Sequence, residues 1–166
     1  ESKIPLDVLK TGVLPSDSIL DLVIGNCAGA IGEVSSLLLV AGGVYLLIRR
    51  VISWRIPVSF IGTVALVTLV FPNYNGVAAE FMIYELLSGA LILAAFFMAT
   101  DYVTRPVTKN GQIVFGILLG LLTGIFRIFG PGAEGVSYAI IIGNLLVPLI
   151  EKITYPKAFG KGGERA

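Results

Sequence analysis

The chain has 166 residues, of which 55% are hydrophobic and only 14% are charged. A soluble domain needs many more charged groups on its surface, so this composition excludes an ordinary soluble protein and predicts a membrane protein. The net charge of +1 gives no reason to expect nucleic acid as a partner. The chain has no histidine and a single cysteine, Cys27, so it cannot supply a complete Cys/His metal site or an iron–sulfur ligand set.

The N-terminal part of the chain predicts two short segments. Residues 1–17 are polar and turn-forming, and we expect them to form an extracytoplasmic segment. Residues 18–32 are apolar but interrupted by glycines and shorter than the roughly 20 residues of a transmembrane helix. This pattern predicts a re-entrant half-helix. Because the sequence begins Glu-Ser-Lys without an initiator methionine, we also expect a fragment or a processed product.

Five apolar segments follow, and they predict an all-α, polytopic membrane protein. The expected transmembrane helices span residues 33–50, 56–72, 80–99, 112–130 and 134–150. With the half-helix they form one transmembrane domain, residues 18–150, followed by a cytoplasmic tail, residues 151–166. Gly116, Gly120 and Gly124 recur at four-residue spacing, so this stripe is expected to pack closely against another helix.

The loop charges predict the orientation in the membrane. Lys and Arg in short loops favour the cytoplasmic side. The loops after the first and third predicted helices and the tail carry these residues, whereas 73–79 and 131–133 contain none. The C-terminus is therefore expected in the cytoplasm.

Two positions are the main candidates for function. Glu33 joins the half-helix to the first predicted helix, where a costly intramembrane carboxylate indicates an ion pathway or a binding role. The alternative is a helix cap. Thr100 and Asp101 end the third predicted helix, where they either bind a ligand across a helix gap or form part of a polar interfacial loop.

Two other polar residues have simpler expected roles. Arg127 is expected to extend toward the lipid head groups, with Glu134 as a possible carboxylate partner. Asn144 is expected to form an interhelical hydrogen bond that aids packing. The sequence contains no phosphate-binding loop, nucleophile elbow or paired acid and base, and we identify no catalytic residue and no metal site. A self-contained enzyme is therefore not expected.

Three stretches carry a family resemblance. They are residues 25–35 (GNCAGAIGEVS), residues 96–112 (FFMATDYVTRPVTKNGQ), and residues 127–148, which include Arg127, Glu134 and Asn144. Together, and in this order, they resemble the NqrB/RnfD family, most closely the C-terminal half of its RnfD members, which belong to the Rnf ion-translocating electron transport complex. The alternative is the equivalent NqrB component of the Na⁺-pumping NADH:quinone reductase.

The resemblance implies a fold and a function. It implies one repeat of an inverted-repeat, urea-transporter-like fold in a bacterial or archaeal plasma membrane. It also implies a non-autonomous subunit of a redox-driven Na⁺ or H⁺ pump that binds FMN or riboflavin and works with ferredoxin, NAD and partner subunits carrying iron–sulfur clusters and flavins. Candidate flavin-binding residues are Asn26, Gly29, Glu33, Thr100 and Asp101, and candidate ion-pathway residues are Glu33 and Asp101.

One position departs from the family pattern. The resemblance places Ile4 where the family carries the threonine that attaches FMN through its phosphate. Isoleucine has no oxygen for that bond, so we identify no covalent flavin residue. Two other functions stay open: a channel or secondary transporter, suggested by the half-helix and Glu33, and a structural anchor for redox subunits.

Overall fold

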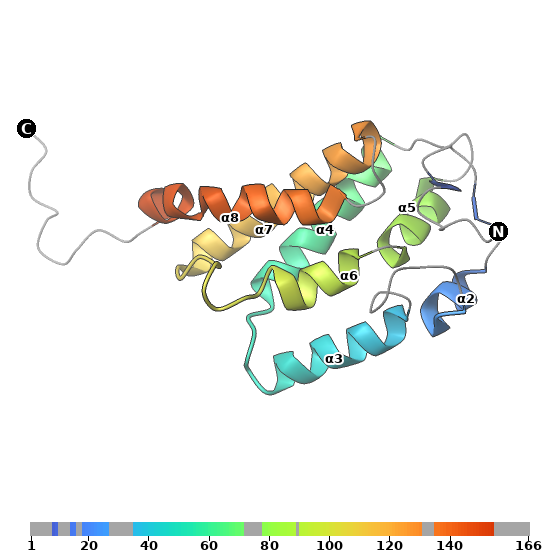
Figure 1. The fold of residues 1–166 in the computed structure, drawn as a ribbon, viewed down its shortest axis with the longest axis horizontal. Helices are drawn as coiled ribbons and strands as arrows, with labels where there is room; N and C mark the ends of the chain where they lie inside the picture. The colour runs from blue at the N-terminus through green and yellow to red at the C-terminus, as the bar shows by residue number, and fades with distance from the viewer. Residues whose placement is uncertain are drawn as a thin grey trace, which may run out of the picture.

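The computed structural model of the chain describes residues 8–9, 14–15, 18–26, 35–71, 78–88, 90–130 and 135–154. Within these residues the regular structure is helical and includes no strand. The elements are α2 (Ile19–Ile24), α3 (Ser36–Ile48), α4 (Arg55–Val70), α5 (Ala78–Leu87), α6 (Leu91–Leu93), the π-helical segment η1 (Ala94–Met98), α7 (Lys109–Phe129) and α8 (Gly135–Thr154). The all-helical expectation is confirmed for this part of the chain (Figure 1).

Two of these helices, α7 and α8, are long and apolar enough to cross a membrane. The segment predicted as one helix over 80–99 is instead divided into α5 and α6–η1, which are bent by 67° relative to each other and count as a third span if taken together. The apolar helices α3 and α4 have 13 and 16 residues, shorter than the roughly 20 of a perpendicular span. The count of five transmembrane helices and the division into N-terminal segment, membrane domain and tail stay predictions.

Helices α4 and α7 pack together most closely, because small residues of α7 face α4. A Cβ atom placed on Gly120 would lie 2.5 Å from Cβ of Thr63 and 2.9 Å from the carbonyl oxygen of Phe60. Gly116 faces Ser59 and Gly124 faces Val67 in the same way, so both helices use four-residue spacing. The expectation that the glycine stripe faces another helix is confirmed, and that helix is α4.

The hydroxyl groups at this helix pair are satisfied within α4. Ser59 Oγ donates to the carbonyl oxygen of Arg55 at 2.6 Å, and Thr63 Oγ1 donates to that of Ser59 at 2.7 Å. Such bonds to the preceding turn leave no free donor on a packed surface. Small polar residues can therefore stand at the α4–α7 contact without a partner on α7.

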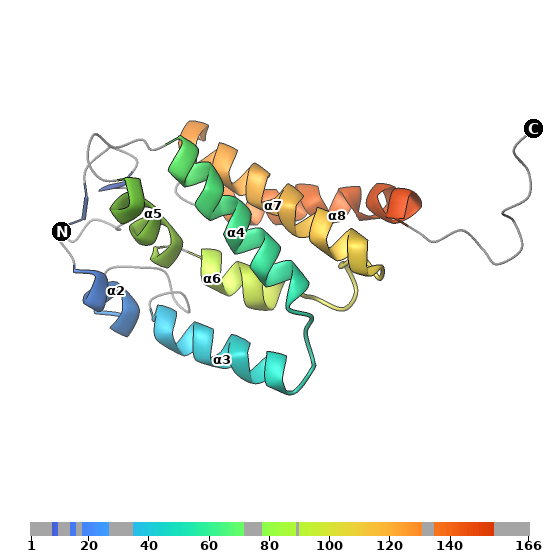
Figure 2. The same cartoon turned by 180° about the vertical axis from the view of Figure 1, so that it is seen from behind.

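The main apolar core lies between α4, α6–η1, α7 and α8 (Figures 1 and 2). Its buried members are Ile56, Phe60, Val64, Leu91, Ala94, Ala95, Ala99, Phe115, Leu119, Val136, Ile140 and Ile150. Gly143 allows α8 to approach α7, since a Cβ there would lie 2.5 Å from Cδ2 of Leu119. In contrast, α3 lies at the edge of the molecule and contacts the rest mainly through α2 and the α6–η1 segment.

The predicted half-helix is described only in part. Ser18 caps α2: its hydroxyl accepts from the backbone N–H of Asp21, whose carboxylate accepts from the Ser18 backbone N–H. This capping box fixes the start of the helix. Gly25 ends α2 with φ at 101°, a left-handed conformation that glycine adopts without strain. Residues 27–34 lie outside the described part of the chain.

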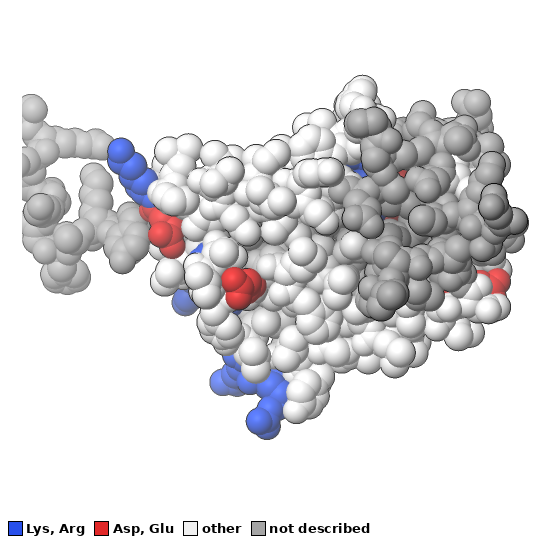
Figure 3. Space-filling view, viewed as in Figure 1, with Lys and Arg blue, Asp and Glu red and all other residues white. Residues whose placement is uncertain are grey.

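Most of the described basic side chains gather at one end of the molecule, shown in blue in Figure 3. They follow α3, begin α4, flank the loop before α7 and end α8: Arg49, Arg50, Arg55, Arg105, Lys109 and Lys152. The loops at this end are joined by Gln112, which donates to the carbonyl oxygen of Pro106 at 3.2 Å and accepts from Ser53 Oγ at 2.7 Å. The elements thus have one charged end, as the loop pattern predicted.

Candidate functional site

The predicted site residues of the half-helix region are described only at Asn26. This residue is exposed, and its backbone N–H donates to the carbonyl oxygen of Asp21 at 2.9 Å. Gly29 and Glu33 lie outside the described residues, as does Cys27. The roles predicted for Glu33, in flavin binding and in an ion pathway, therefore stay predictions.

Thr100 and Asp101 lie after η1 and differ in environment. Thr100 is buried, and its hydroxyl donates to the carbonyl oxygen of Phe96 at 2.7 Å, within the π-helical turn. Asp101 is exposed and accepts from Thr104 Oγ1 at 3.4 Å. The loop is held to the end of α3 by Tyr102, whose hydroxyl donates to the carbonyl oxygen of Val51. Of the two predicted site residues, only Asp101 is accessible to a ligand from solvent.

The described members of the predicted flavin set do not come together. Asn26 follows Gly25, which packs against Ser35 at the beginning of α3, with 3.0 Å from a Cβ built on Gly25 to the Ser35 Cβ. Thr100 and Asp101 lie instead by the opposite end of α3, near Val51. The helix between them has 13 residues, a rise of roughly 20 Å. These three residues alone do not form one flavin cradle, and the rest of the set lies outside the described residues.

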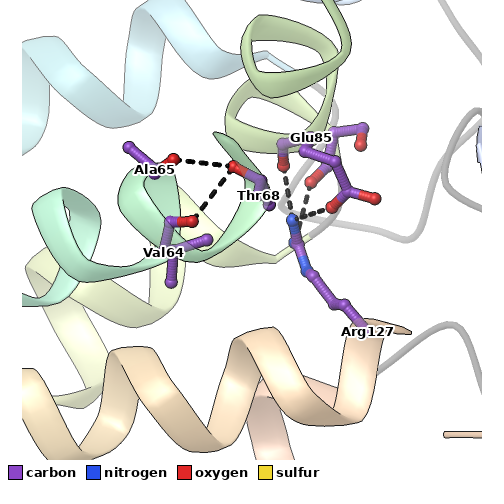
Figure 4. Close-up of polar contacts among 6 residues, drawn as sticks. Val64, Ala65, Thr68, Glu85 and Arg127 are labelled. Carbon is purple, nitrogen blue, oxygen red and sulfur yellow. Dashed lines mark hydrogen bonds and ion pairs between the residues drawn. The ribbon is translucent and has the colours of Figure 1, made fainter. Parts of the chain in front are cut away.

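A different polar cluster occupies the break between α5 and α6 (Figure 4). Arg127, in the last turn of α7, forms an ion pair with Glu85 of α5, with 2.6 Å between Nη1 and Oε2. The same Nη1 donates to the carbonyl oxygen of Glu85, and Nη2 donates to that of Ser88 at 3.1 Å. Three oxygens at the end of α5 thus converge on one guanidinium group.

This ion pair is buried inside the protein. The side chain of Arg127 is 1% exposed and that of Glu85 is 5% exposed. Beside them, Thr68 of α4 turns its hydroxyl to the carbonyl oxygens of Val64 and Ala65, away from the guanidinium (Figure 4). Removing one partner of a buried pair leaves an uncompensated charge, which typically costs about 3–5 kcal/mol. The pair therefore fixes the position of α5 relative to α7.

The helix break exposes backbone carbonyl groups, and neighbouring helices satisfy them. Arg127 is not the only donor, because the hydroxyl of Ser36 in α3 donates to the carbonyl oxygen of Leu87 at 3.0 Å. Broken helices are tolerated at membrane depth only where other groups satisfy the freed backbone. Arg127 from α7 and Ser36 from α3 together supply those donors at the end of α5.

Several buried polar atoms of this region have no hydrogen-bond partner within the described part of the chain. They are Ser88 Oγ, Thr123 Oγ1 and Arg127 Nε. Ser88 is a member of the cluster, and Thr123 precedes Arg127 by one helical turn, which places both on the same face of α7. Leaving buried polar groups unpaired is unfavourable, so the break has more polar groups than its contacts use.

The structure corrects the sequence-based interpretation of Arg127. The prediction that it extends to the lipid head groups is wrong, because its guanidinium is buried and paired with Glu85. The alternative partner, Glu134, lies outside the described residues. Glu85 was missed, although the signal was present: one carboxylate and one guanidinium lie in two apolar segments, where unpaired charges are costly.

Asn144 also differs from expectation. Its Oδ1 is buried but receives no hydrogen bond from the described residues, so the predicted interhelical bond is not found at this atom. It lies four residues before Pro148, within α8. Proline has no N–H, so the helical bond to the carbonyl oxygen of Asn144 is missing there.

The helices and the buried charge pair define a helical membrane protein with a broken helix. Comparison with known proteins gives its family. The model of the NQR2, RnfD, RnfE family matches residues 1–160, and the chain belongs to this family. The resemblance found in the three sequence stretches is confirmed.

Curated relatives agree with this assignment, and each is the D component of its complex. The chain is 44% identical over 139 residues to that of the proton-translocating ferredoxin:NAD(+) oxidoreductase complex of Clostridium ljungdahlii, covering 84% of this chain and 42% of that protein. It is 42% identical over 159 residues to that of the Na(+)-translocating ferredoxin:NAD(+) oxidoreductase complex of Acetobacterium woodii, covering 94% and 48%. It is 38% identical over 163 residues to that of the ion-translocating oxidoreductase complex of Aliivibrio salmonicida, covering 94% and 46%. The chain thus spans slightly less than half the length of these relatives.

Proposed function

We propose that this chain is part of the RnfD component of an Rnf-type complex, a redox-driven pump that couples electron transfer from ferredoxin to NAD⁺ with ion transport. The observation that carries the proposal is the identity of 38–44% over most of the chain to three proteins named as the D component of such complexes. Their names include both a proton-translocating and a Na⁺-translocating complex, so the transported ion is left open.

The proposal includes the finer features that the family resemblance implies. The chain would form one repeat of a urea-transporter-like fold in a bacterial or archaeal plasma membrane, with its basic end and C-terminus in the cytoplasm. The apolar helices support the membrane location, and the gathering of basic residues at one end supports the orientation. Partner subunits would carry the iron–sulfur clusters and further flavins.

We further propose that the subunit binds FMN or riboflavin within the membrane. When bound, the flavin would supply one-electron and two-electron transfer. Asp101 supports this proposal, because it is an exposed carboxylate of the predicted set and is accessible to a ligand. Glu33 and Gly29 would complete the site, and we assign no covalent attachment because Ile4 stands at the expected threonine position.

The first experiment is to purify the full-length protein within its complex from native membranes and to measure its intact mass and flavin content. We expect flavin in the complex, and fluorescence on a denaturing gel together with an FMN-sized mass increase if the attachment is covalent. Flavin that is released on denaturation would show non-covalent binding. A complex that carries no flavin in either form would exclude the flavin-dependent proposal.

The second experiment separates the redox subunit from an anchor. Asp101→Asn and Glu33→Gln are compared in the complex for ferredoxin-dependent NAD⁺ reduction and for ion uptake into inverted vesicles. Glu80→Gln is the matched control, because Glu80 is an exposed carboxylate at the start of α5. We expect lower turnover or uptake only in the first two variants. Equal activity in all three would favour a structural anchor.

A channel or secondary transporter is the second candidate, because the chain contains a broken helix with a buried charge pair. Such helix breaks form many ion and substrate sites in transporters. Solute flux through the purified subunit in liposomes, without its partner subunits or an electron donor, would favour this function over the redox proposal.

A further inference from the structure

The surroundings of the Arg127 guanidinium are those of a cation site. Its ligands are one carboxylate oxygen of Glu85 and the backbone carbonyl oxygens of Glu85 and Ser88. The carbonyl groups lie at the C-terminal end of α5, which carries partial negative charge. Carboxylates and the carbonyl groups of interrupted membrane helices are also the groups that hold Na⁺ and protons in transporters.

We propose that Arg127 is a tethered cation: it fills a cation site at the α5–α6 break and thereby excludes free monovalent cations and protons from it. The inference concerns the membrane part of the chain and does not depend on flavin binding or on the redox role. The ligand excluded in the native protein is a small monovalent cation or a proton.

The unused polar groups distinguish this site from an ordinary structural ion pair. Ser88 and Thr123 are 3% and 0% exposed, yet their hydroxyl oxygens have no partner within the described residues. A pair that served only to join two helices would gain nothing from two idle buried hydroxyls, because each one costs desolvation. Hydroxyl oxygens are, however, suitable additional ligands for a small cation. The break therefore offers more oxygen ligands than the guanidinium uses.

Charge balance makes a prediction for each partner. Arg127→Met leaves the carboxylate and carbonyl groups buried without a cation, so the site should admit Na⁺ or a proton. Glu85→Gln retains the guanidinium and removes the negative charge, so the site should repel cations. The double variant Arg127→Met/Glu85→Gln is neutral and should not attract them. Only the first variant is expected to leak.

The test uses the intact complex with the full-length subunit in liposomes, with no electron donor. Passive uptake is measured with a trapped Na⁺-sensitive dye and, in a second arm, with a trapped pH-sensitive dye. We expect uptake in Arg127→Met to rise about tenfold or more in at least one arm, because an uncompensated buried charge strongly favours cation entry. Glu85→Gln, the double variant and the charge-conserving Arg127→Lys should stay near wild type.

The pattern across the variants decides the proposal. Similar leaks in Arg127→Met, Glu85→Gln and the double variant would show that loosened packing is the cause, and would overturn it. An assembled Arg127→Met complex that admits neither ion would overturn it as well.

A second measurement covers poor assembly of the variants. Arg127→Ala removes the guanidinium and leaves its space, so added guanidinium ion should raise the thermal unfolding temperature of this variant at concentrations far below denaturing ones. Arg127→Ala/Glu85→Gln should gain less, since it lacks the carboxylate. Equal gains in both variants, or none in Arg127→Ala, would contradict a cation site.

Discussion

Helices α7 and α3 are both apolar and both contain glycines, but the structure uses them differently. Nine residues of α7 are buried, whereas only Ser36 and Gly43 are buried in α3. Helix α7 lies against α4 and α8, while α3 lies at the edge (Figures 1 and 2). The apolar side chains of α3 therefore face outward, among them Leu37, Leu38, Val44, Tyr45 and Ile48.

The difference follows from the spacing of the small residues, not from their number. Gly116, Gly120 and Gly124 recur every four residues and lie on one face, so α7 meets α4 over its whole middle part. The two glycines of α3, Gly42 and Gly43, are adjacent and meet only Phe97 and Phe96 of η1. A repeated stripe makes a continuous helix contact, and an adjacent pair makes a single local one.

The largest expected effect tests the α7 stripe. Gly120→Val should lower the free energy of unfolding by about 3 kcal/mol or more, because the new side chain meets the backbone of Phe60 and the helices must separate. Gly62→Val is the matched control, since nothing lies within 4 Å of a Cβ at Gly62. Denaturation of the complex in detergent measures both. If the two variants lose the same stability, the stripe does not carry the α4–α7 contact.

Part of this fold could be predicted from the sequence. The period of the glycine stripe predicted a helix contact, and the composition predicted apolar helices, because both signals depend on neighbours in the sequence. The bend between α5 and α6 was not predicted. Its local signal, the small residues 88–90, was interpreted as close packing, and no proline marks the break.

The site was less predictable, because its contacts join distant residues. Arg127 and Glu85 are separated by 42 positions, and a sequence alone does not give which faces of two apolar helices meet. The presence of one positive and one negative residue in such helices predicts a pair, but not its depth. The outward position assigned to Arg127 assumed that its nearest polar surroundings were the lipid head groups, whereas the α5–α6 break supplies them inside the protein.

A smaller effect is expected at the single contact of α3 with η1. Gly43→Ala should cost about 1–2 kcal/mol, because a Cβ there collides with the base of the Phe96 ring, but α3 can move outward at the edge. Gly42→Ala is the matched control: its Cβ would meet only the far end of the Phe97 ring, at 3.2 Å. The same denaturation measurement applies. A loss at Gly43 as large as that at Gly120 would show that α3 is held as firmly as α7.

The smallest effect concerns the bond by which α3 reaches the helix break. Ser36→Ala removes the donor to the carbonyl oxygen of Leu87 and should cost about 0.6 kcal/mol, the average for hydrogen bonds between membrane helices. Ser59→Ala is the control, because the Ser59 hydroxyl bonds only to carbonyl groups of its own helix, and it should change stability little. A loss at Ser36 comparable to the several kcal/mol expected for an unpaired buried charge would mean that α3 and α7 hold the break equally. A loss no greater than that of Ser59→Ala would mean that Arg127 alone maintains it.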